Sequence, residues 1–351
     1  MRILDFMEAN GHEQLAVWTD PGAGLRAFIA IHDTTLGPSL GGTRVWAHPT
    51  EDDALFDVLR LSQAMTYKSA AAGLDFGGGK ALIMADPRTD KTEAMFRSYG
   101  RFVESLGGRY VTTEDVGSTP YDLEASARET NHVVGLPVER GGSGNPSTMT
   151  AYGLYQAMRA AAKARWGGDD LAGRSVALQG FGNVASSLAE HLLEAGARLI
   201  VADVDPAKAE RAAALGATVV GVDDILAQEC DVLAPCALGG VLNERSIPAL
   251  RCEVICGAAN NQLLSPEDAE RLRERDILYA PDYIVNAGGV INVSFEVGRA
   301  YDEEAARAKT ARIYDTLEQV FAMAQERGVT TAAAADLIAE ERLAAARAER
   351  A

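Results

Sequence analysis

The sequence predicts an α/β protein with two domains. Its 351 residues suit about two domains of roughly 100–200 residues each. In the first part, β-rich runs alternate with helical ones. After residue 175 the pattern changes to short apolar runs, most of them followed by polar or helical segments. With 47% hydrophobic and 24% charged residues, the composition is that of a globular chain.

The charge balance argues against two classes of partner. The chain has 33 Lys and Arg against 50 Asp and Glu, a formal net charge of −17. A strongly negative field repels nucleic acid and anionic membranes alike. No apolar run reaches the roughly 18 residues of a membrane helix. Asp5 and Glu8 come too early for a signal-peptide core, so we expect a cytoplasmic protein.

In the first part of the chain, β-branched and aromatic content predicts strands at residues 14–19, 25–32, 43–47, 80–85 and 109–113. Helical spacing predicts helices at 51–67 and 91–105. Thr50, followed by three acidic residues, resembles a capped helix start. The glycine-rich segment 141–148 is either a flexible linker or a hinge over a cleft.

The second part predicts a parallel sheet covered on both faces. A strong helix is expected at 151–164, and Ala-rich helices at 303–324 and 331–350. The strands are expected at residues 176–179, 199–203, 218–221, 231–235, 254–258 and 278–281. The cysteines Cys230, Cys236, Cys252 and Cys256 lie in this part, without Cys-x-x-Cys or His partners at ligand spacing. We therefore expect reduced, packed thiols and no metal.

One turn matches the dinucleotide-binding pattern G-x-G-x-x-G/A. It lies between a predicted strand and an apolar helix, and Asp203 ends the next strand about 20 residues on. The pattern predicts a Rossmann domain in which the helix N-terminus binds a pyrophosphate. A carboxylate at 203, with no Arg directly after it, favours NAD over NADP. A purely structural turn is the alternative. The residues concerned are Gly180, Phe181, Gly182, Asn183, Val184, Ala185 and Asp203.

Two lysines and an aspartate form a candidate catalytic group. Lys68 is expected to end a helix, and Lys80 to open a strand after three glycines. If both face one cleft, one would bind a substrate carboxylate and the other, desolvated, would act as a base. Asp115, just beyond a strand end, could exchange protons. The alternatives are two solvated lysines and an aspartate that caps a helix or turn.

Seven ordered motifs carry a resemblance over nearly the whole chain. They are residues 40–44 (LGGTR), 65–68 (MTYK), 77–80 (GGGK), 113–117 (TEDVG), 180–185 (GFGNVA), 258–261 (AANN) and 281–289 (PDYIVNAGG). Together they resemble the amino acid dehydrogenase family acting on glutamate, leucine, phenylalanine and valine, and most of all its leucine-acting branch. The resemblance implies an N-terminal substrate-binding and oligomerisation domain at 1–140, to which a helix at about 330–351 returns. It also implies a Rossmann NAD-binding domain at 145–330, and a cleft between the two domains that closes on substrate.

The resemblance also implies roles for individual residues. Lys68 would bind the substrate α-carboxylate with backbone near Gly41 and Gly42, while Lys80 and Asp115 would be catalytic. Asn286 would lie near the reacting centre. Ala237, Thr150 and Asn261 would contact the dinucleotide. The implied reaction is reversible oxidative deamination of an L-amino acid to a 2-oxo acid and ammonium by NAD. The implied assembly is a homo-oligomer, a dimer or larger.

Motif positions place Leu40, Thr113, Val290 and Val293 around the substrate side chain. No lysine or serine stands at these positions to hold a glutamate side-chain carboxylate, so branched aliphatic substrates (leucine, valine and isoleucine) are expected. Thr113 departs from the pattern, because leucine-acting members usually carry Ala there and phenylalanine-acting members Gly. The alternatives are a phenylalanine or tryptophan dehydrogenase and a non-catalytic NAD-binding regulator.

Overall fold

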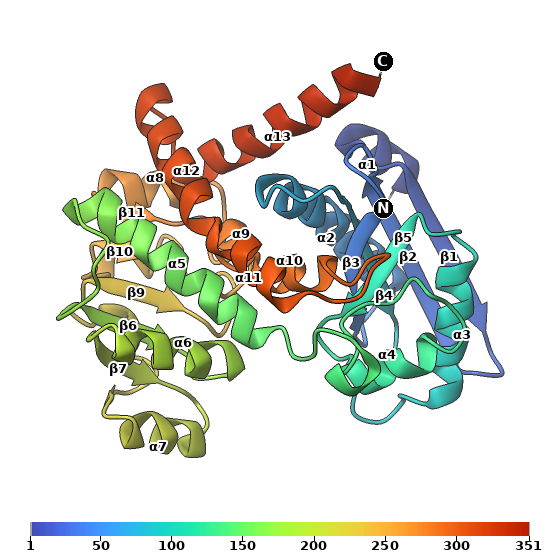
Figure 1. The fold of residues 1–351 in the computed structure, drawn as a ribbon, viewed down its shortest axis with the longest axis horizontal. Coiled ribbons are helices and arrows are strands. Elements are labelled where there is room, and N and C mark those ends of the chain that lie inside the picture. The colour runs from blue at the N-terminus through green and yellow to red at the C-terminus, as the bar shows by residue number, and fades with distance from the viewer. Residues whose placement is uncertain (1, 351) are drawn as a thin grey trace. The chain divides into compact units, whose positions relative to one another are not determined.

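The computed structural model describes residues 2–350, which form two compact units (Figure 1). Among the described residues, unit 1 comprises 2–146, 290–306 and 339–350, and unit 2 comprises 147–289 and 307–338. Segment 290–306 and the end of the chain thus return to the first unit. Among the helices of residues 2–350, none combines the length and apolar character that a membrane crossing demands.

Unit 1 is built on a five-stranded sheet of order β1-β2-β4-β3-β5. The β3–β4 and β3–β5 pairs are parallel, while β1–β2 and β2–β4 are antiparallel. The strands are β1 (Gln14–Asp20), β2 (Leu25–Asp33), β3 (Ser39–Val45), β4 (Gly77–Ile83) and β5 (Tyr110–Glu114). The helices are α1 (Ile3–Asn10), α2 (Glu51–Ala71), α3 (Glu93–Glu104) and α4 (Pro120–Ser126), with a 3₁₀ turn at Val138–Arg140.

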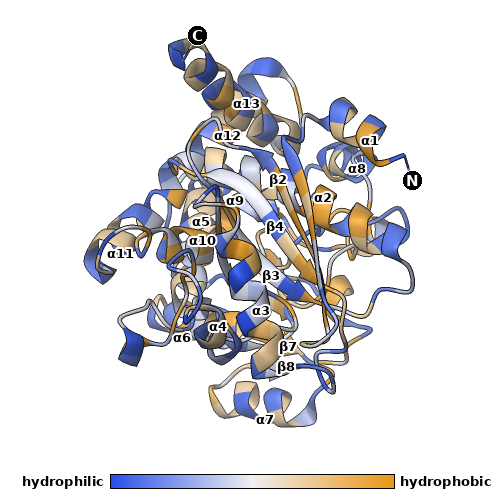
Figure 2. Cartoon of the chain, turned by 90° about the vertical axis from the view of Figure 1, so that its right-hand side faces the viewer, coloured by the Kyte–Doolittle hydropathy of each residue, from blue (hydrophilic) through white to orange (hydrophobic). Residues whose placement is uncertain are grey.

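Helices α2 and α3 cover opposite faces of this sheet, because alternate strand residues point to opposite sides. Phe28 and Leu82 pack with Val58 and Leu59 of α2, while their neighbours pack against α3. Apolar residues, orange in Figure 2, are prominent on α1 and α2. The predicted cap of α2 is confirmed, since the Thr50 side chain accepts a hydrogen bond from the Asp53 amide.

Unit 2 has a six-stranded, wholly parallel sheet of order β11-β10-β9-β6-β7-β8, which confirms the predicted Rossmann-like fold. Its strands are β6 (Ser175–Gln179), β7 (Arg198–Ala202), β8 (Thr218–Val219), β9 (Val232–Pro235), β10 (Val254–Ile255) and β11 (Leu278–Tyr279). Its helices are α5 (Ser147–Trp166), α6 (Asn183–Glu194), α7 (Pro206–Ala214), α8 (Glu267–Glu274), α9 (Asp282–Val285) and α12 (Ile313–Arg327), with 3₁₀ turns at Ile225–Ala227 and Ile247–Ala249.

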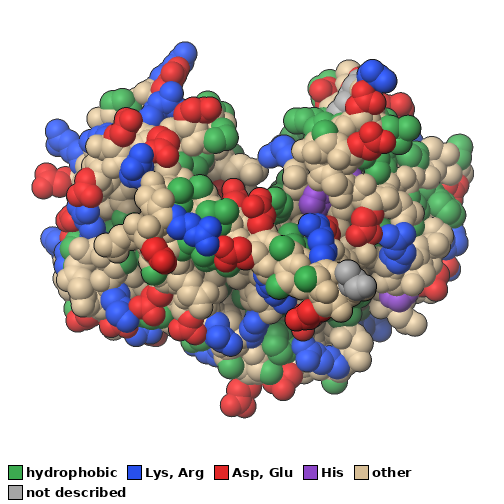
Figure 3. All heavy atoms as spheres, turned by 90° about the horizontal axis from the view of Figure 1, so that it is seen from above, with side chains coloured by type: hydrophobic (Ala, Val, Ile, Leu, Met, Phe, Trp, Pro, Cys, Tyr) green, Lys and Arg blue, Asp and Glu red, His purple; other side chains and the backbone are tan. Residues whose placement is uncertain are grey.

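Three helices span the boundaries between the units along the chain: α10 (Gly288–Ser294), α11 (Glu303–Ala311) and α13 (Thr331–Arg350). The helical character expected at 303–324 is confirmed, but the segment forms two helices, because α11 ends at Ala311 and α12 begins at Ile313. On the face shown in Figure 3, acidic and basic side chains are intermingled on both units. The net negative charge does not form a single acidic patch on that face.

Two buried histidines in unit 1 predict acid sensitivity. The His12 and His32 rings lie 4.7 Å apart. Burial lowers the pKa of each, against hydrogen bonds to Leu59 and Asn10 backbone carbonyls that raise it. Below the ordinary histidine pKa of 6.5, the unfolded chain takes up protons on these side chains more readily than the folded protein does. The free energy of unfolding is therefore highest above pH 6.5 and decreases as the pH falls below it.

We therefore expect the melting temperature to fall between about pH 7 and pH 5. His32→Gln should give a flatter pH dependence of the melting temperature than the wild type. The half-exposed His132 provides the control, so His132→Gln should keep the wild-type slope. Equal slopes in all three proteins would contradict the assignment to the buried pair.

Candidate active site

Lys80 lies in the middle of β4, not at its start. The sequence interpretation was wrong here, because the three glycines that resemble a loop belong to the strand. At Gly78 a Cβ atom would lie 2.1 Å from the backbone nitrogen of Thr66, so only glycine lets α2 lie this close to β4. The expected helix end at Lys68 is also too early, because α2 continues to Ala71 and Lys68 lies in its last turn.

Lys80 and Asp115 form an ion pair with 2.9 Å between Nζ and Oδ2. Lys80 is 5% exposed. The pairs Leu40↔Gly78 and Gly42↔Thr113 place Gly42 between Lys80 and Thr113 in one row across β4, β3 and β5. A Cβ atom at Gly42 would lie 2.7 Å from the Asp115 Cβ. The absent side chain therefore leaves room for the ion pair above the sheet.

Asp115 has a second cationic partner, Arg44, whose Nε lies 3.1 Å from Oδ2. Burial raises the pKa of Asp115, but the charges of Lys80 and Arg44 outweigh burial and lower it to about 2. Asp115 is therefore a carboxylate at neutral pH. It can accept a proton or hold a cationic nitrogen, which suits a substrate amine.

Lys68 belongs to the same unit, and its local structure is well anchored. The C-terminal carbonyls of α2 at Ala70 and nearby Leu74 accept hydrogen bonds from Arg342 of α13, at 3.0 and 2.8 Å. A Cβ atom at Gly41 would lie 1.7 Å from the Gly79 carbonyl oxygen, so backbone passes close to backbone there. Gly41, Gly42, Lys68, Lys80 and Asp115 therefore share unit 1.

The four residues expected around a substrate side chain also lie in unit 1. Leu40 and Val293 pack in one apolar cluster, with Val290 against it. Thr113 stands two residues beyond Val111, a further member of the cluster, and so points to the same face of β5. Its hydroxyl oxygen is buried without a hydrogen-bond partner among the described residues. The side-chain candidates are thus apolar except for one unpaired hydroxyl.

In unit 2 the glycine turn follows β6. Gly180 has φ +92°, and a Cβ atom there would lie 2.8 Å from the Ala237 Cβ. Gly182 lies before α6, and open space surrounds its missing side chain within the described structure. In that same part of the chain no side chain caps the N-terminus of α6. Open amides beside a bare glycine fit a pyrophosphate group.

Asp203 ties this turn to β7. Its two oxygens accept hydrogen bonds from the amides of Phe181 (2.7 Å) and Asp205 (2.8 Å). Burial raises the pKa of Asp203, but these hydrogen bonds and nearby Lys208 and Arg211 lower it overall. The side chain is ionised at neutral pH, as a partner of ribose hydroxyls requires.

Asn286, which is expected near the reacting centre on the substrate side, stands in a hydrogen-bond network in unit 2. Its Nδ2 donates to the Ala258 carbonyl (3.0 Å) and to Asn260 Oδ1 (2.7 Å), and its own Oδ1 is buried without a partner among residues 2–350. Asn261 adopts φ +52°, a conformation that asparagine tolerates. Gly288, two positions after Asn286, lies against Thr150. A Cβ atom at Gly288 would be 2.9 Å from the Thr150 Cα.

The predicted site residues therefore fall into two groups. Unit 1 brings together Gly42, Lys80, Thr113 and Asp115, and it also holds Leu40, Gly41, Lys68, Val290 and Val293. Unit 2 holds Gly180, Phe181, Gly182, Asn183, Val184, Ala185, Asp203, Ala237, Asn261, Asn286 and Thr150. One group carries the lysine–carboxylate ion pair, and the other carries the glycine turn that matches the dinucleotide-binding pattern.

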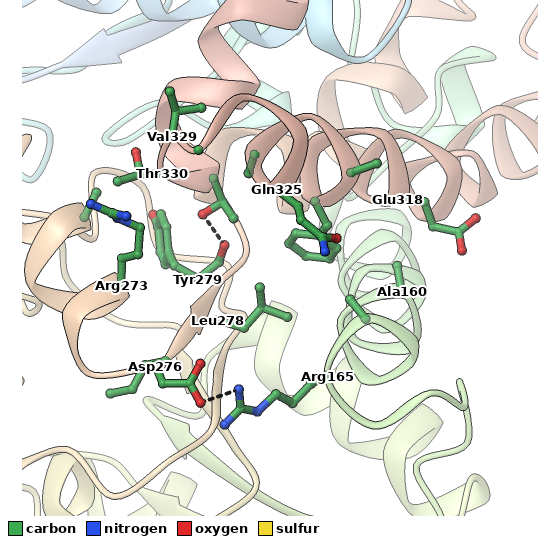
Figure 4. Close-up of a pocket in the computed structure, with 18 of the residues that line it drawn as sticks. Ala160, Arg165, Arg273, Asp276, Leu278, Tyr279, Glu318, Gln325, Val329 and Thr330 are labelled. Carbon is green, nitrogen blue, oxygen red and sulfur yellow. Dashed lines mark hydrogen bonds and ion pairs between the residues drawn. The ribbon is translucent and has the colours of Figure 1, made fainter.

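A pocket of about 740 Å³ lies elsewhere in unit 2, between α5, α8, α12 and the edge strand β11. Figure 4 shows its charged rim, where Arg165 pairs with Asp276 at 2.9 Å. The Thr331 hydroxyl donates a hydrogen bond to the Tyr279 carbonyl. Strands β9 and β10 separate β11 from β6, after which the glycine turn comes. This pocket is therefore distinct from the dinucleotide turn, although it is large.

The cysteines are reduced thiols. All four are free, and burial raises the pKa of Cys230 and Cys252 to about 12. Within residues 2–350, no group of three or more His, Cys, Asp or Glu side chains is arranged to hold a metal ion.

Two residues near the site were missed by sequence reasoning. Arg44 lies within a recognised motif, and its position two residues after Gly42 on one strand could have placed it on the same face. Glu296 accepts hydrogen bonds from the amides of Gly135 (3.0 Å) and Ser143 (2.8 Å), which fixes both ends of one loop. Its separation of more than 150 residues from both leaves no local signal.

A dinucleotide turn in one unit and a buried lysine–carboxylate pair in the other define a nucleotide-dependent dehydrogenase. Comparison with known proteins identifies the kind. Residues 12–132 match the family described as Glu/Leu/Phe/Val dehydrogenase, dimerisation domain. Residues 141–208 and 204–351 match Glutamate/Leucine/Phenylalanine/Valine dehydrogenase. The chain belongs to the Glu/Leu/Phe/Val dehydrogenase family.

Individual relatives agree over nearly full length. Leucine dehydrogenase of Geobacillus stearothermophilus is 52% identical, over 98% of this chain and 94% of the relative. Valine dehydrogenase of Streptomyces virginiae is 48% identical, over 99% and 98%. The crystal structure of L-tryptophan dehydrogenase from Nostoc punctiforme is 45% identical with a TM-score of 0.86, over 98% and 99%. The chain is thus an amino acid dehydrogenase, an oxidoreductase of a pyridine nucleotide-dependent family.

Proposed function

We propose that this enzyme oxidises branched-chain L-amino acids with NAD. The reaction is L-amino acid + NAD⁺ + H₂O giving 2-oxo acid + NH₄⁺ + NADH + H⁺, and it is reversible. The observation that carries the proposal is the Lys80–Asp115 pair, which shares a sheet face with an apolar cluster containing Leu40 and Val293. An amine-handling group beside an apolar surface suits an aliphatic amino acid.

In this proposal Lys68 binds the substrate α-carboxylate, with backbone amides near Gly41 and Gly42. Lys80 orients and activates the water that attacks the imine carbon, and Asp115 exchanges protons with the substrate nitrogen. When bound, the dinucleotide accepts the hydride that leaves Cα. Unit 1 supplies these groups and orients the substrate, which lowers the entropic part of the barrier. We also propose a homo-oligomer, a dimer or larger.

The dinucleotide fits unit 2 on three grounds. Gly182 leaves open space before the uncapped α6, and the ionised Asp203 suits ribose hydroxyls while it repels a 2′-phosphate. The unpaired Oδ1 of Asn286 can accept a hydrogen bond from a carboxamide N–H. Ala237, Thr150 and Asn261 complete the proposed dinucleotide contacts. These groups favour NAD over NADP.

The test is reduction of NAD or NADP with a panel of L-amino acids. Valine, leucine and isoleucine should lead, with NAD preferred. Leading aromatic substrates would favour the phenylalanine or tryptophan type. No turnover with either dinucleotide would favour a non-catalytic regulator.

Thr113 is expected to limit substrate size. Thr113→Ala and Thr113→Gly remove a half-buried side chain, so phenylalanine should gain on valine in kcat/KM by roughly 10–200-fold, the range for one methylene or a little more in an apolar pocket. Thr112→Ser is the matched control, because Thr112 points to the opposite face, where its hydroxyl contacts Thr43 and Tyr99. Unchanged ratios in the Thr113 variants would refute this role.

A further inference from the structure

Arg44 connects the catalytic pair to helix α2. Its Nε lies 3.1 Å from Asp115 Oδ2, and its Nη1 lies 2.8 Å from Asp57 Oδ2. Asp57 lies on α2 and is also approached by Arg60 at 3.3 Å and by His48 at 3.4 Å. A continuous chain of alternating charges thus runs from Lys80 through Asp115 and Arg44 to Asp57.

The sheet register explains why Arg44 reaches Asp115. Thr43 pairs with Glu114, so the next residues along these parallel strands, Arg44 and Asp115, are neighbours. Arg44 follows Gly42 by two positions and therefore points to the same face as Lys80. Helix α2 covers that face, which is why its Asp57 meets the other side of the guanidinium group.

Both cations contact the same oxygen of Asp115. Lys80 Nζ and Arg44 Nε bind Oδ2, while Oδ1 receives no hydrogen bond from any described residue. The Asp115 side chain is 23% exposed, so a ligand can approach it. One oxygen is therefore anchored and the other is available, which is the arrangement required to accept a proton from a defined direction.

We propose that Arg44 is a positioning residue that fixes the Asp115 carboxylate, so that Oδ1 exchanges protons with the substrate nitrogen. The proposal rests on the function proposed above and assigns a role to an oxygen atom and to a residue that does not touch substrate. Asp57 holds the guanidinium plane by its second edge. A planar fork can bind two carboxylates at fixed angles, whereas the lysine ammonium is a point charge that cannot.

The alternative is that Arg44 serves stability only, as many ion pairs do. The two roles differ in kinetics. A positioning role lowers kcat while the amino acid KM, which depends on Lys68 in this proposal, stays nearly constant. A purely structural role lowers the melting temperature and the active fraction, but leaves kcat per folded molecule unchanged.

The experiment compares Arg44→Lys, Arg44→Gln and Arg60→Gln in the full-length enzyme. Arg60 contacts Asp57 but not Asp115, and it is 44% exposed, so it is the matched control. Arg44→Lys should lower kcat by about 10-fold and Arg44→Gln by about 100-fold, because small misplacements of catalytic groups have effects of this order. The amino acid KM should change less than about threefold, and Arg60→Gln should match the wild type.

A double-mutant cycle tests whether Arg44 acts through Asp115. In the Asp115→Asn background, Arg44→Lys should change kcat by less than about twofold, because the carboxylate that it positions is gone. Wild-type kcat in a folded Arg44→Lys enzyme, or an undiminished effect in the Asp115→Asn background, would overturn the proposal. A wild-type enzyme inactive on every amino acid would instead overturn the proposed function, so the two failures are distinguishable.

Discussion

Lys80→Ala is expected to lower kcat by about 10³-fold or more, the range for loss of a proton-transferring group. In the proposed reaction Lys80 is the group that activates water. Among the described residues, no other lysine forms an ion pair with Asp115, so no second lysine can replace it. The amino acid KM should change only a few-fold. The measurement is steady-state NADH formation with the preferred amino acid, at several concentrations of each substrate.

Two matched lysines make this result specific. Lys68→Ala should raise the amino acid KM more than it lowers kcat, because Lys68 is proposed to bind the carboxylate in both ground and transition states. Lys91 also forms an ion pair in unit 1, with Asp122 at 2.6 Å, but neither residue belongs to a site motif and neither contacts Lys80 or Asp115 in any described ion pair. Lys91→Ala should keep the wild-type kcat. If Lys80→Ala is folded and retains more than about a tenth of the wild-type kcat, Lys80 is not the catalytic lysine.

The folded state should survive this substitution. Asp115 keeps Arg44 as a cationic partner when the lysine is removed, so its charge is not left unpaired. A melting curve for each variant separates a loss of chemistry from a loss of folded enzyme. Lys80→Met, which retains much of the side-chain volume, gives a second and better-packed variant for the same kinetic comparison.

The sequence predicts those parts of the fold that depend on residues close together in the chain. The Gly180–Gly182 turn could be predicted because glycine spacing, the preceding strand and the following helix all lie within about 25 residues. The Thr50 cap of α2 could be predicted for the same reason. The parallel sheet of unit 2 followed from its short apolar runs.

Contacts distant in sequence explain what could not be predicted. The run Gly77–Gly79 has the composition of a loop, but it forms a strand that pairs with β2 and β3 while α2 packs directly on Gly78. Arg44 and Asp115 are 71 residues apart, so their contact depends on the pairing of β3 with β5. The family resemblance marks Thr113 as a departure, but only the structure shows that its hydroxyl is buried without a described partner.

Gly182→Val is expected to weaken dinucleotide binding strongly without destabilising the protein. No described atom lies within 4 Å of the position of the new Cβ, and the backbone there is extended (φ −76°, ψ −168°), so valine fits the folded chain. The side chain would occupy the space where the pyrophosphate approaches the amides of α6. Loss of one charge-assisted hydrogen bond costs about 1.5–3 kcal/mol, which is roughly a 10–150-fold loss of NAD affinity.

The control for this prediction is the neighbouring glycine. Gly180→Ala introduces a Cβ atom 2.8 Å from Ala237 at a φ of +92°, so it should lower the melting temperature as well as NAD binding. Titration of NADH by fluorescence, beside a melting curve for each variant, measures both effects without requiring turnover. Wild-type NADH affinity in a stable Gly182→Val protein would show that this turn does not bind the pyrophosphate. An unstable Gly182→Val protein would show that the open space at Gly182 is filled, and the cofactor assignment would lose its main structural support.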